Sequence, residues 1–180
     1  MRGLALWDLV RGRRAPSRRT SAKAQPRKQT AQQQRYDALV ADMKSTWRIR
    51  IHKWRTSTSG CAWELRDRQG EVTRMIEAPY PRGPVSCAVF LHEVGHHAIG
   101  FAHQRLRCME EHLAWEWAIR EMRQRGFHVS KRVLERRRLA MQYALRKALR
   151  RGLKAVPEPL LQWLPEHQPM TLADHPNANG

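Results

Sequence analysis

Residues 91–97 read Leu-His-Glu-Val-Gly-His-His, and their types and spacing suit a metal site. His92 and His96 are four residues apart, so on a helix both imidazoles project from one face and can share a Zn²⁺ ion. Glu93 follows His92 and is turned from it by about 100°, where its carboxylate can reach a zinc-bound water without binding the metal. The motif predicts a zinc site at which Glu93 acts as general base.

A catalytic zinc site needs a third protein ligand and an open position for water. Glu111 is the leading candidate, because at helical spacing it shares a side with apolar residues, where an unpaired carboxylate would be unfavourable. Glu110 is turned away from that side by about 100° and is the fallback. His103 is another candidate, since the segment leading to it resembles the metzincin extension, with glycine and histidine each one residue late. His112 is a weaker one, expected to face solvent beside the site.

Periodicities in the sequence predict strands before the motif and helices around it. A Gly-containing turn predicts a hairpin, and a Pro-rich loop over residues 78–84 separates it from the motif helix. We expect strands over residues 47–54, 61–66 and 71–76. We expect helices over residues 36–45, 85–101, 109–123 and 130–151. The predicted fold class is α+β, a small antiparallel sheet packed on the motif-bearing helix plus two further helices.

The order of these elements resembles that of the ImmA/IrrE-type zincins. The resemblance is carried by the strand, the hairpin, the Pro-containing loop and the motif helix. It continues with Glu111, a small residue at Ala114, and an aromatic-Ala pair at Trp117 and Ala118. It covers residues 45–125, and the two ends of the chain lie outside it. SprT-like proteases are similar in outline but would have a third histidine in place of the glutamate.

The resemblance implies a minimal zincin-like domain with peptidase activity, often directed at a DNA-bound regulator. It implies His92, His96 and Glu111 as zinc ligands and Glu93 as the general base. Position 115, four residues after Glu111, is Trp where the family tends to carry Asn or Asp to steady a histidine.

The formal net charge of +18 is concentrated in two blocks. Residues 1–35 hold ten Lys and Arg against one Asp, and residues 128–154 hold ten against one Glu. The first block has few apolar side chains and is expected to be disordered, whereas the second predicts an amphipathic helix with Leu134 on its apolar side. Both blocks are either solvated surfaces or strips that contact nucleic acid through phosphates. The candidate contacts are Arg13, Arg14, Arg18, Arg19, Arg132, Arg136, Lys147 and Arg150.

We therefore divide the chain into a disordered basic arm (1–35), a zincin-like domain that includes the basic helix (36–154) and a loosely packed tail (155–180). No apolar run approaches the ~20 residues that a membrane span needs, so no membrane partner is expected. Three cysteines, an odd and sparse set, favour a reducing compartment, and we expect a cytoplasmic protein. The Arg- and Ser-rich arm also resembles an organelle transit peptide.

The predicted function is a zinc metallopeptidase acting on a protein or peptide substrate, with a nucleic-acid-associated regulator as one candidate. The alternative is a non-catalytic, zinc-stabilised module that binds nucleic acid or a regulatory protein through the basic blocks. The strand over 47–54 is expected to be the edge that receives an extended peptide. Candidates for the group that stabilises the oxyanion are Tyr80, His97, His103 and His112.

Overall fold

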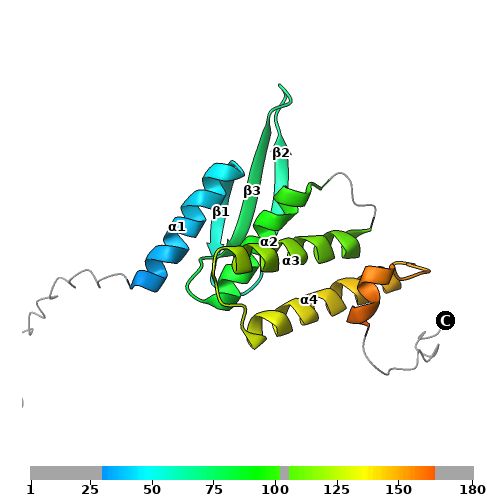
Figure 1. Cartoon of the computed structure of the whole chain (residues 1–180). Helices are drawn as coiled ribbons and strands as arrows, with labels where there is room; N and C mark the ends of the chain where they lie inside the picture. The colour runs from blue at the N-terminus through cyan, green and yellow to red at the C-terminus, as the bar shows by residue number, and fades with distance from the viewer. Residues whose placement is uncertain (1–29, 102–105, 165–180) are drawn as a thin grey trace, which may run out of the picture.

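A computed structural model describes residues 30–101 and 106–164, and its fold is α+β, as the sequence predicts. A three-stranded sheet lies against a central helix, which in turn contacts the helices that follow it (Figure 1). The elements are α1 (Ala31–Thr46), β1 (Ile49–Arg55), β2 (Cys61–Arg66), β3 (Val72–Pro79), α2 (Pro84–Ile99), α3 (Arg107–Gln124), α4 (Lys131–Arg150) and the 3-10 helix η1 (Glu158–Trp163). Among these residues, no helix combines the length and the apolar character needed to span a bilayer.

The sheet has the strand order β1-β3-β2 and is mixed, not antiparallel as the sequence predicted. β2 and β3 form the expected antiparallel hairpin, with Trp63 opposite Met75. β1 pairs in parallel with the other edge of β3, with Ile51 opposite Ile76. The local turn between β2 and β3 determines how these two strands pair. The pairing of β1 with β3 joins segments that are distant in the sequence, and it places β3 between two strands. Ile76 and Ala78 of β3 are fully buried, and β3 is the strand that lies in the middle.

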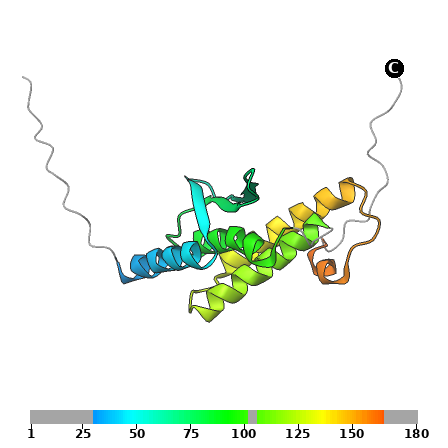
Figure 2. The same cartoon turned by 90° about the horizontal axis from the view of Figure 1, so that it is seen from above.

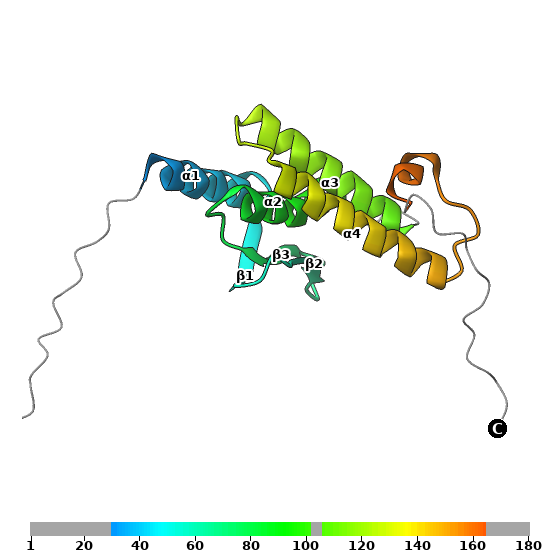
Figure 3. The ribbon, with the colours of Figure 1, turned by 90° about the horizontal axis from the view of Figure 1, so that it is seen from below.

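Helix α2, which carries the motif, is buried on all sides. Every residue over 87–97 is buried. Figure 3 shows the reason, because α2 lies between the sheet on one side and α3 on the other. The helix begins at Pro84, and the hydroxyl of Ser86 accepts a hydrogen bond from the backbone N–H of Gly83. An interior helix is expected to be apolar all round, so its histidines and glutamate are exceptions that need partners.

Helices α2 and α3 come into close contact at Gly95. A Cβ atom at this position would lie 2.8 Å from the carbonyl oxygen of Ala114 and 3.2 Å from the ring of Trp117. Glycine within a helix is less favourable than alanine by about 1 kcal/mol, so its presence here is explained by the neighbouring backbone. The close approach brings the first turns of α3 against the histidines of α2.

Helix α4 crosses α3 (Figure 2), and it contacts both α3 and α2. The hydroxyl of Ser130 accepts from the N–H of Val133 at its start, and Gly152, with φ of 90°, follows its end. Its buried side chains are Val133, Met141 and Leu145. The sequence placed Leu134 on the apolar side, but it is 43% exposed, because the buried stripe passes through its neighbour instead.

The two ends of the described chain are more ordered than the domain division suggested. Helix α1 begins at Ala31, inside the segment expected to be a disordered arm, and η1 buries Leu160 completely against α4. Residues 1–29 and 165–180 lie outside the described residues, so the rest of the arm and of the tail stays a prediction.

We expect Gly95→Ala to lower the free energy of unfolding by about 1–3 kcal/mol, because the added methyl group overlaps the backbone of α3. Urea unfolding of the two proteins measures the difference. At a helical position with free space around it, the same substitution raises the free energy of unfolding by about 1 kcal/mol. The sign of the measured change therefore shows whether α3 contacts Gly95. A more stable variant would contradict the close contact.

Candidate metal centre

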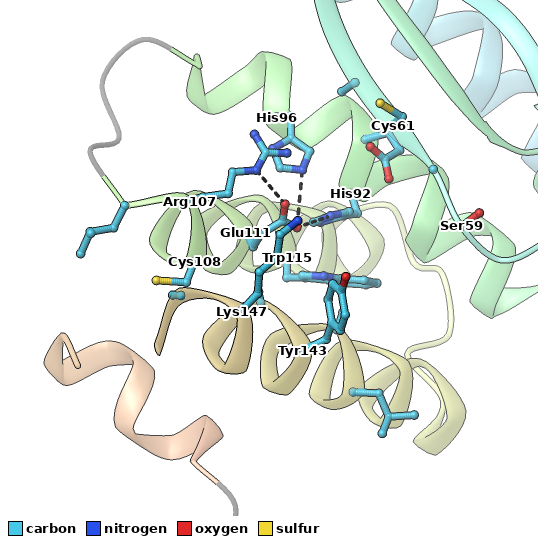
Figure 4. A pocket seen from close by; sticks show the side chains of 18 of the residues that line it. Ser59, Cys61, His92, His96, Arg107, Cys108, Glu111, Trp115, Tyr143 and Lys147 are labelled. Carbon is cyan, nitrogen blue, oxygen red and sulfur yellow. Dashed lines mark hydrogen bonds and ion pairs between the residues drawn. The ribbon is translucent and has the colours of Figure 1, made fainter. Parts of the chain in front are cut away.

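Two imidazoles from α2 and a carboxylate from α3 meet between these helices. Nε2 of His92 lies 3.1 Å from Oε2 of Glu111, and Nε2 of His96 lies 3.8 Å from the same oxygen. The ligand atoms of the three residues all lie within 4.8 Å of one another. Figure 4 shows the three side chains pointing toward one another. This group can hold a metal ion, as the spacing of the two histidines and the stripe on α3 predicted.

The adjacent carboxylates Glu110 and Glu111 have different partners. Oε1 of Glu110 accepts hydrogen bonds from Nδ1 of His96 at 3.0 Å and from Arg107 at 2.7 Å. A carboxylate held by a guanidinium accepts from the imidazole, so Nδ1 of His96 carries the proton and Nε2 presents a free lone pair to the cluster. A carboxylate behind a metal-binding histidine fixes its tautomer and raises its basicity. Glu111 thus occupies the ligand position, and Glu110, the fallback, lies behind the His96 ring.

Glu111 is held in its ionised form. Burial by itself raises the pKa of this carboxyl, but the hydrogen bond from His92 and the positive charges around it, including that of Arg107, outweigh burial and lower the pKa to about 2. Nε of Arg107 lies 3.1 Å from Oε1 of Glu111, so one guanidinium contacts the carboxylates of both Glu110 and Glu111. An ionised carboxylate is the form that binds a cation.

Trp115 sets the orientation of His92. The two rings stack with centroids 4.4 Å apart and an angle of 20° between their planes. Nδ1 of His92 is buried and has no hydrogen-bond partner among the described residues. The Asn or Asp expected at position 115 from the zincin resemblance is therefore replaced by an aromatic ring that packs against the imidazole and does not hydrogen-bond to it.

Glu93 lies in the same pocket, beside the group that can hold a metal and not within it. Its side chain packs against Gly60, where a Cβ atom would collide with the carboxylate. Burial raises the pKa of Glu93 to about 7, and the electrostatic interaction with His96 acts in the opposite direction. A carboxyl group with a pKa near neutrality can both accept and donate a proton, which is what general acid–base chemistry needs.

A pocket of about 780 Å³ opens onto the cluster. The start of β2, including Cys61 and Ala62, lines one side, and α4 lines another (Figure 4). The residues of α4 and its C-cap that line the pocket follow helical spacing along one face; they are Arg136, Leu139, Ala140, Tyr143, Ala144, Lys147, Ala148 and Arg151. Pockets of this size commonly hold small ligands or short stretches of a chain.

The residues considered for stabilising an oxyanion lie away from this pocket or outside the described residues. Tyr80 donates its hydroxyl proton to a carboxylate of α1, and His97 contacts a carbonyl oxygen of β3. His112, expected to face solvent, is buried and accepts a hydrogen bond from the indole of η1. His103 lies outside the described residues. The tyrosine that does line the pocket is Tyr143.

The basic residues proposed for nucleic-acid contact do not form one surface. Arg136 and Lys147 line the pocket, whereas Arg132 and Arg150 are exposed on α4 and do not line it. The four basic residues of the arm lie outside the described residues; they are Arg13, Arg14, Arg18 and Arg19. Half of the candidate contacts on α4 therefore line the pocket that contains His92, His96 and Glu111.

The 47–54 strand is an edge strand, as the sequence analysis expected, but the edge strand that lines the pocket is β2. β1 and β2 are the two edges of the sheet, because β3 lies between them. No described residue of β1 lines the pocket, and α1 packs against that strand. The hairpin thus presents its first strand to the cluster.

Sequence reasoning missed Gly60, Arg107 and the pocket-facing side of α4. Gly60 ends a Ser- and Thr-rich turn, and nothing in that turn indicates a contact with the motif helix. The role of Arg107 could have been predicted, since it precedes Glu110 and Glu111 by three and four residues, which is the spacing of ion pairs on a helix.

We expect Glu111→Ala to lose bound metal, because it removes one of three ligands. Glu110→Ala should still bind metal with an affinity about 10- to 100-fold lower, because His96 loses its supporting carboxylate. Metal analysis of purified protein and Zn²⁺ titration measure both effects. His103→Ala is the matched control for the alternative third ligand and should retain full metal content. Loss of metal from His103→Ala with retention in Glu111→Ala would contradict the assignment.

Comparison with known proteins finds no relative. No protein-family model, no curated protein and no solved structure matches this chain.

Proposed function

We propose that this protein is a zinc-dependent peptidase of the ImmA/IrrE-like type, which hydrolyses a peptide bond in a protein substrate. The observation that supports this most strongly is the meeting of His92, His96 and Glu111 beside the buried carboxyl of Glu93 in one pocket. Two imidazoles and one carboxylate leave a fourth position open, which is typical of catalytic zinc sites. Mg²⁺ and Ca²⁺ prefer oxygen ligands, so the two nitrogen donors favour Zn²⁺.

His92, His96 and Glu111 would hold the Zn²⁺ ion, which when bound would polarise the scissile carbonyl and make water nucleophilic near neutral pH. Glu93 takes a proton from the attacking water and transfers it to the nitrogen of the leaving amine. Glu110 keeps His96 in the tautomer that presents Nε2, and Trp115 keeps the His92 ring in place. We assign the stabilisation of the developing oxyanion to the hydroxyl group of Tyr143, which lines the α4 wall of the pocket.

The free edge of β2 is the proposed site for the substrate main chain. One edge of β2 pairs with β3, and the other is unpaired in the described sheet. An extended peptide can add to such an edge through main-chain hydrogen bonds. A nucleic-acid-associated regulator stays a candidate substrate. The free thiols of Cys61, Cys87 and Cys108 fit the proposed cytoplasmic setting.

We expect Glu93→Gln to bind Zn²⁺ as the wild type does and to lose at least about 100-fold in peptide cleavage, the typical contribution of a general base. Cleavage of a mixture of short synthetic peptides, followed by mass spectrometry, measures the rate. Glu71→Gln, which changes an exposed carboxyl in the hairpin turn, is the control and should cleave normally.

Equal cleavage by wild type and Glu93→Gln would refute the peptidase proposal. It would favour the alternative of a metal-stabilised binding module, for which Glu93→Gln is neutral in every assay. Salt-dependent binding of an oligonucleotide, unchanged by this substitution, would then identify the alternative.

We expect Gly60→Ala to impair cleavage strongly while Zn²⁺ stays bound, because the new methyl group displaces the carboxylate of Glu93 and leaves the ligands in place. The rate constant should fall more than the affinity for peptide, since the nearest atoms to the new methyl group are those of the Glu93 side chain. Gly83→Ala, where the Cβ position is open and the backbone extended, is the matched control. Full activity in Gly60→Ala would contradict the close packing of Glu93.

A further inference from the structure

We propose that the pocket accepts acidic polypeptide segments, whose carboxylates contact Lys147 and Arg151 on the α4 side. This inference rests on the proposed peptidase function and specifies its class of substrate. Basic side chains line the pocket, some of them lack ion-pair partners, and they lie opposite the start of β2.

The side chains that line the pocket carry an excess of positive charge. Five are basic and two are acidic. The acidic ones are Glu93 and Glu111, and both belong to the cluster, where Arg107 contacts Glu111 directly. The wall formed by α4 and the residues after it therefore has no acidic side chain in the described pocket. The basic residues are Arg107, Arg136, Lys147, Arg151 and Lys154.

Some of these cations are engaged in the fold and others are available. Arg107 contacts the carboxylates of α3, and Arg136 donates to the carbonyl oxygen of Thr58 at 3.0 Å. Lys147, Arg151 and Lys154 form no ion pair within the described parts of the chain. Lys147 is partly buried, whereas Arg151 and Lys154 are exposed, so solvent and salt screen the attraction of an oppositely charged ligand least at Lys147. These three residues are thus the ones that a ligand can neutralise.

The two α4-side residues Lys147 and Arg151 are one helical turn apart and face the pocket together. Small side chains, including Ala144 and Ala148, line the pocket beside them and leave room for a chain. Nζ of Lys147 lies 6.0 Å from the ring centre of Tyr143. Figure 4 shows Lys147 and Tyr143 extending from α4 toward the cluster, so the positive charge is presented to groups next to the reacting bond.

The position of β2 indicates a polypeptide as the occupant. Cys61 at the start of β2 lies across the cluster from Lys147 (Figure 4). A polypeptide can pair its main chain with the free edge of β2 and direct carboxylate side chains to α4 at the same time. A nucleic acid could satisfy the cations but has no main-chain groups that pair with a strand.

Full-length Zn²⁺-loaded Glu93→Gln protein is the material for the test, because it binds peptides without cleaving them. Fluorescence anisotropy measures the affinity for three labelled peptides of equal length, one rich in Glu and Asp, one neutral and one rich in Lys. The acidic peptide should bind most tightly, and its affinity should fall as salt rises. Adding Lys147→Glu to the Glu93→Gln protein should lower its affinity for the acidic peptide by about tenfold, because a surface attraction becomes a repulsion.

Arg146→Glu is the matched control, since it makes the same change of charge at the next residue of α4, which is exposed and does not line the pocket. It should lower the affinity for the acidic peptide by less than about twofold at physiological salt. Equal binding of the three peptides, or equal effects of the two substitutions, would overturn the proposal. So would a single-stranded oligonucleotide that displaces the acidic peptide and loses affinity to the same extent with Lys147→Glu. These binding results are independent of cleavage, so failure of the peptidase proposal appears separately, in the comparison of wild type with Glu93→Gln.

Discussion

The burial of imidazole and carboxylate side chains between α2 and α3 is the constraint on which the rest of the structure depends. Such groups are stable in an interior only when each is paired. Glu110 pairs with His96, Glu111 pairs with His92, and Arg107 contacts both carboxylates. The pairing needs the two helix axes to be close, and Gly95 allows it. The helix contact and the site are therefore one structural feature, because the polar groups would be unfavourable without the contact that brings them together.

The consecutive side chains of Glu110 and Glu111 on α3 point in different directions, because an α-helix turns by about 100° per residue. Glu111 faces the Nε2 atoms of the two histidines, and Glu110 reaches the far side of one of those rings. A rotation of α3 about its axis by one residue would bring Glu110 to the place of Glu111, carry Glu111 away from the histidines and leave His96 without its supporting carboxylate. Trp115, one turn after Glu111, stacks on His92 and restrains the same rotation. The helix is thus locked by contacts on both imidazoles.

The parts of the site that the sequence predicted are those determined by local helix geometry. The four-residue spacing of His92 and His96, and the apolar stripe that includes Glu111, depend only on the period of one helix. The α+β class and the hairpin follow from equally local patterns. The edge that β1 joins, the packing of Gly60 on Glu93 and the pocket wall on α4 involve contacts between distant segments. No single window of the sequence contains that information, so these features required the structure.

A count of basic residues overestimates how much positive charge is available for binding. On α4, Arg137 pairs with Glu116 and lies over the ring of Trp163, so its charge stabilises the packing of α4 against α3 and η1. Arg138 is paired within its own helix. Among the described residues, the basic side chains without an ion pair include Lys147 and Arg151 at the pocket, and also Lys131, Arg132, Arg146 and Arg150 away from it. The large net charge alone therefore does not distinguish a nucleic-acid surface from an anionic peptide site. The distinction depends on which unpaired cations a ligand contacts, and those that line the pocket face the cluster of His92, His96 and Glu111 and the start of β2.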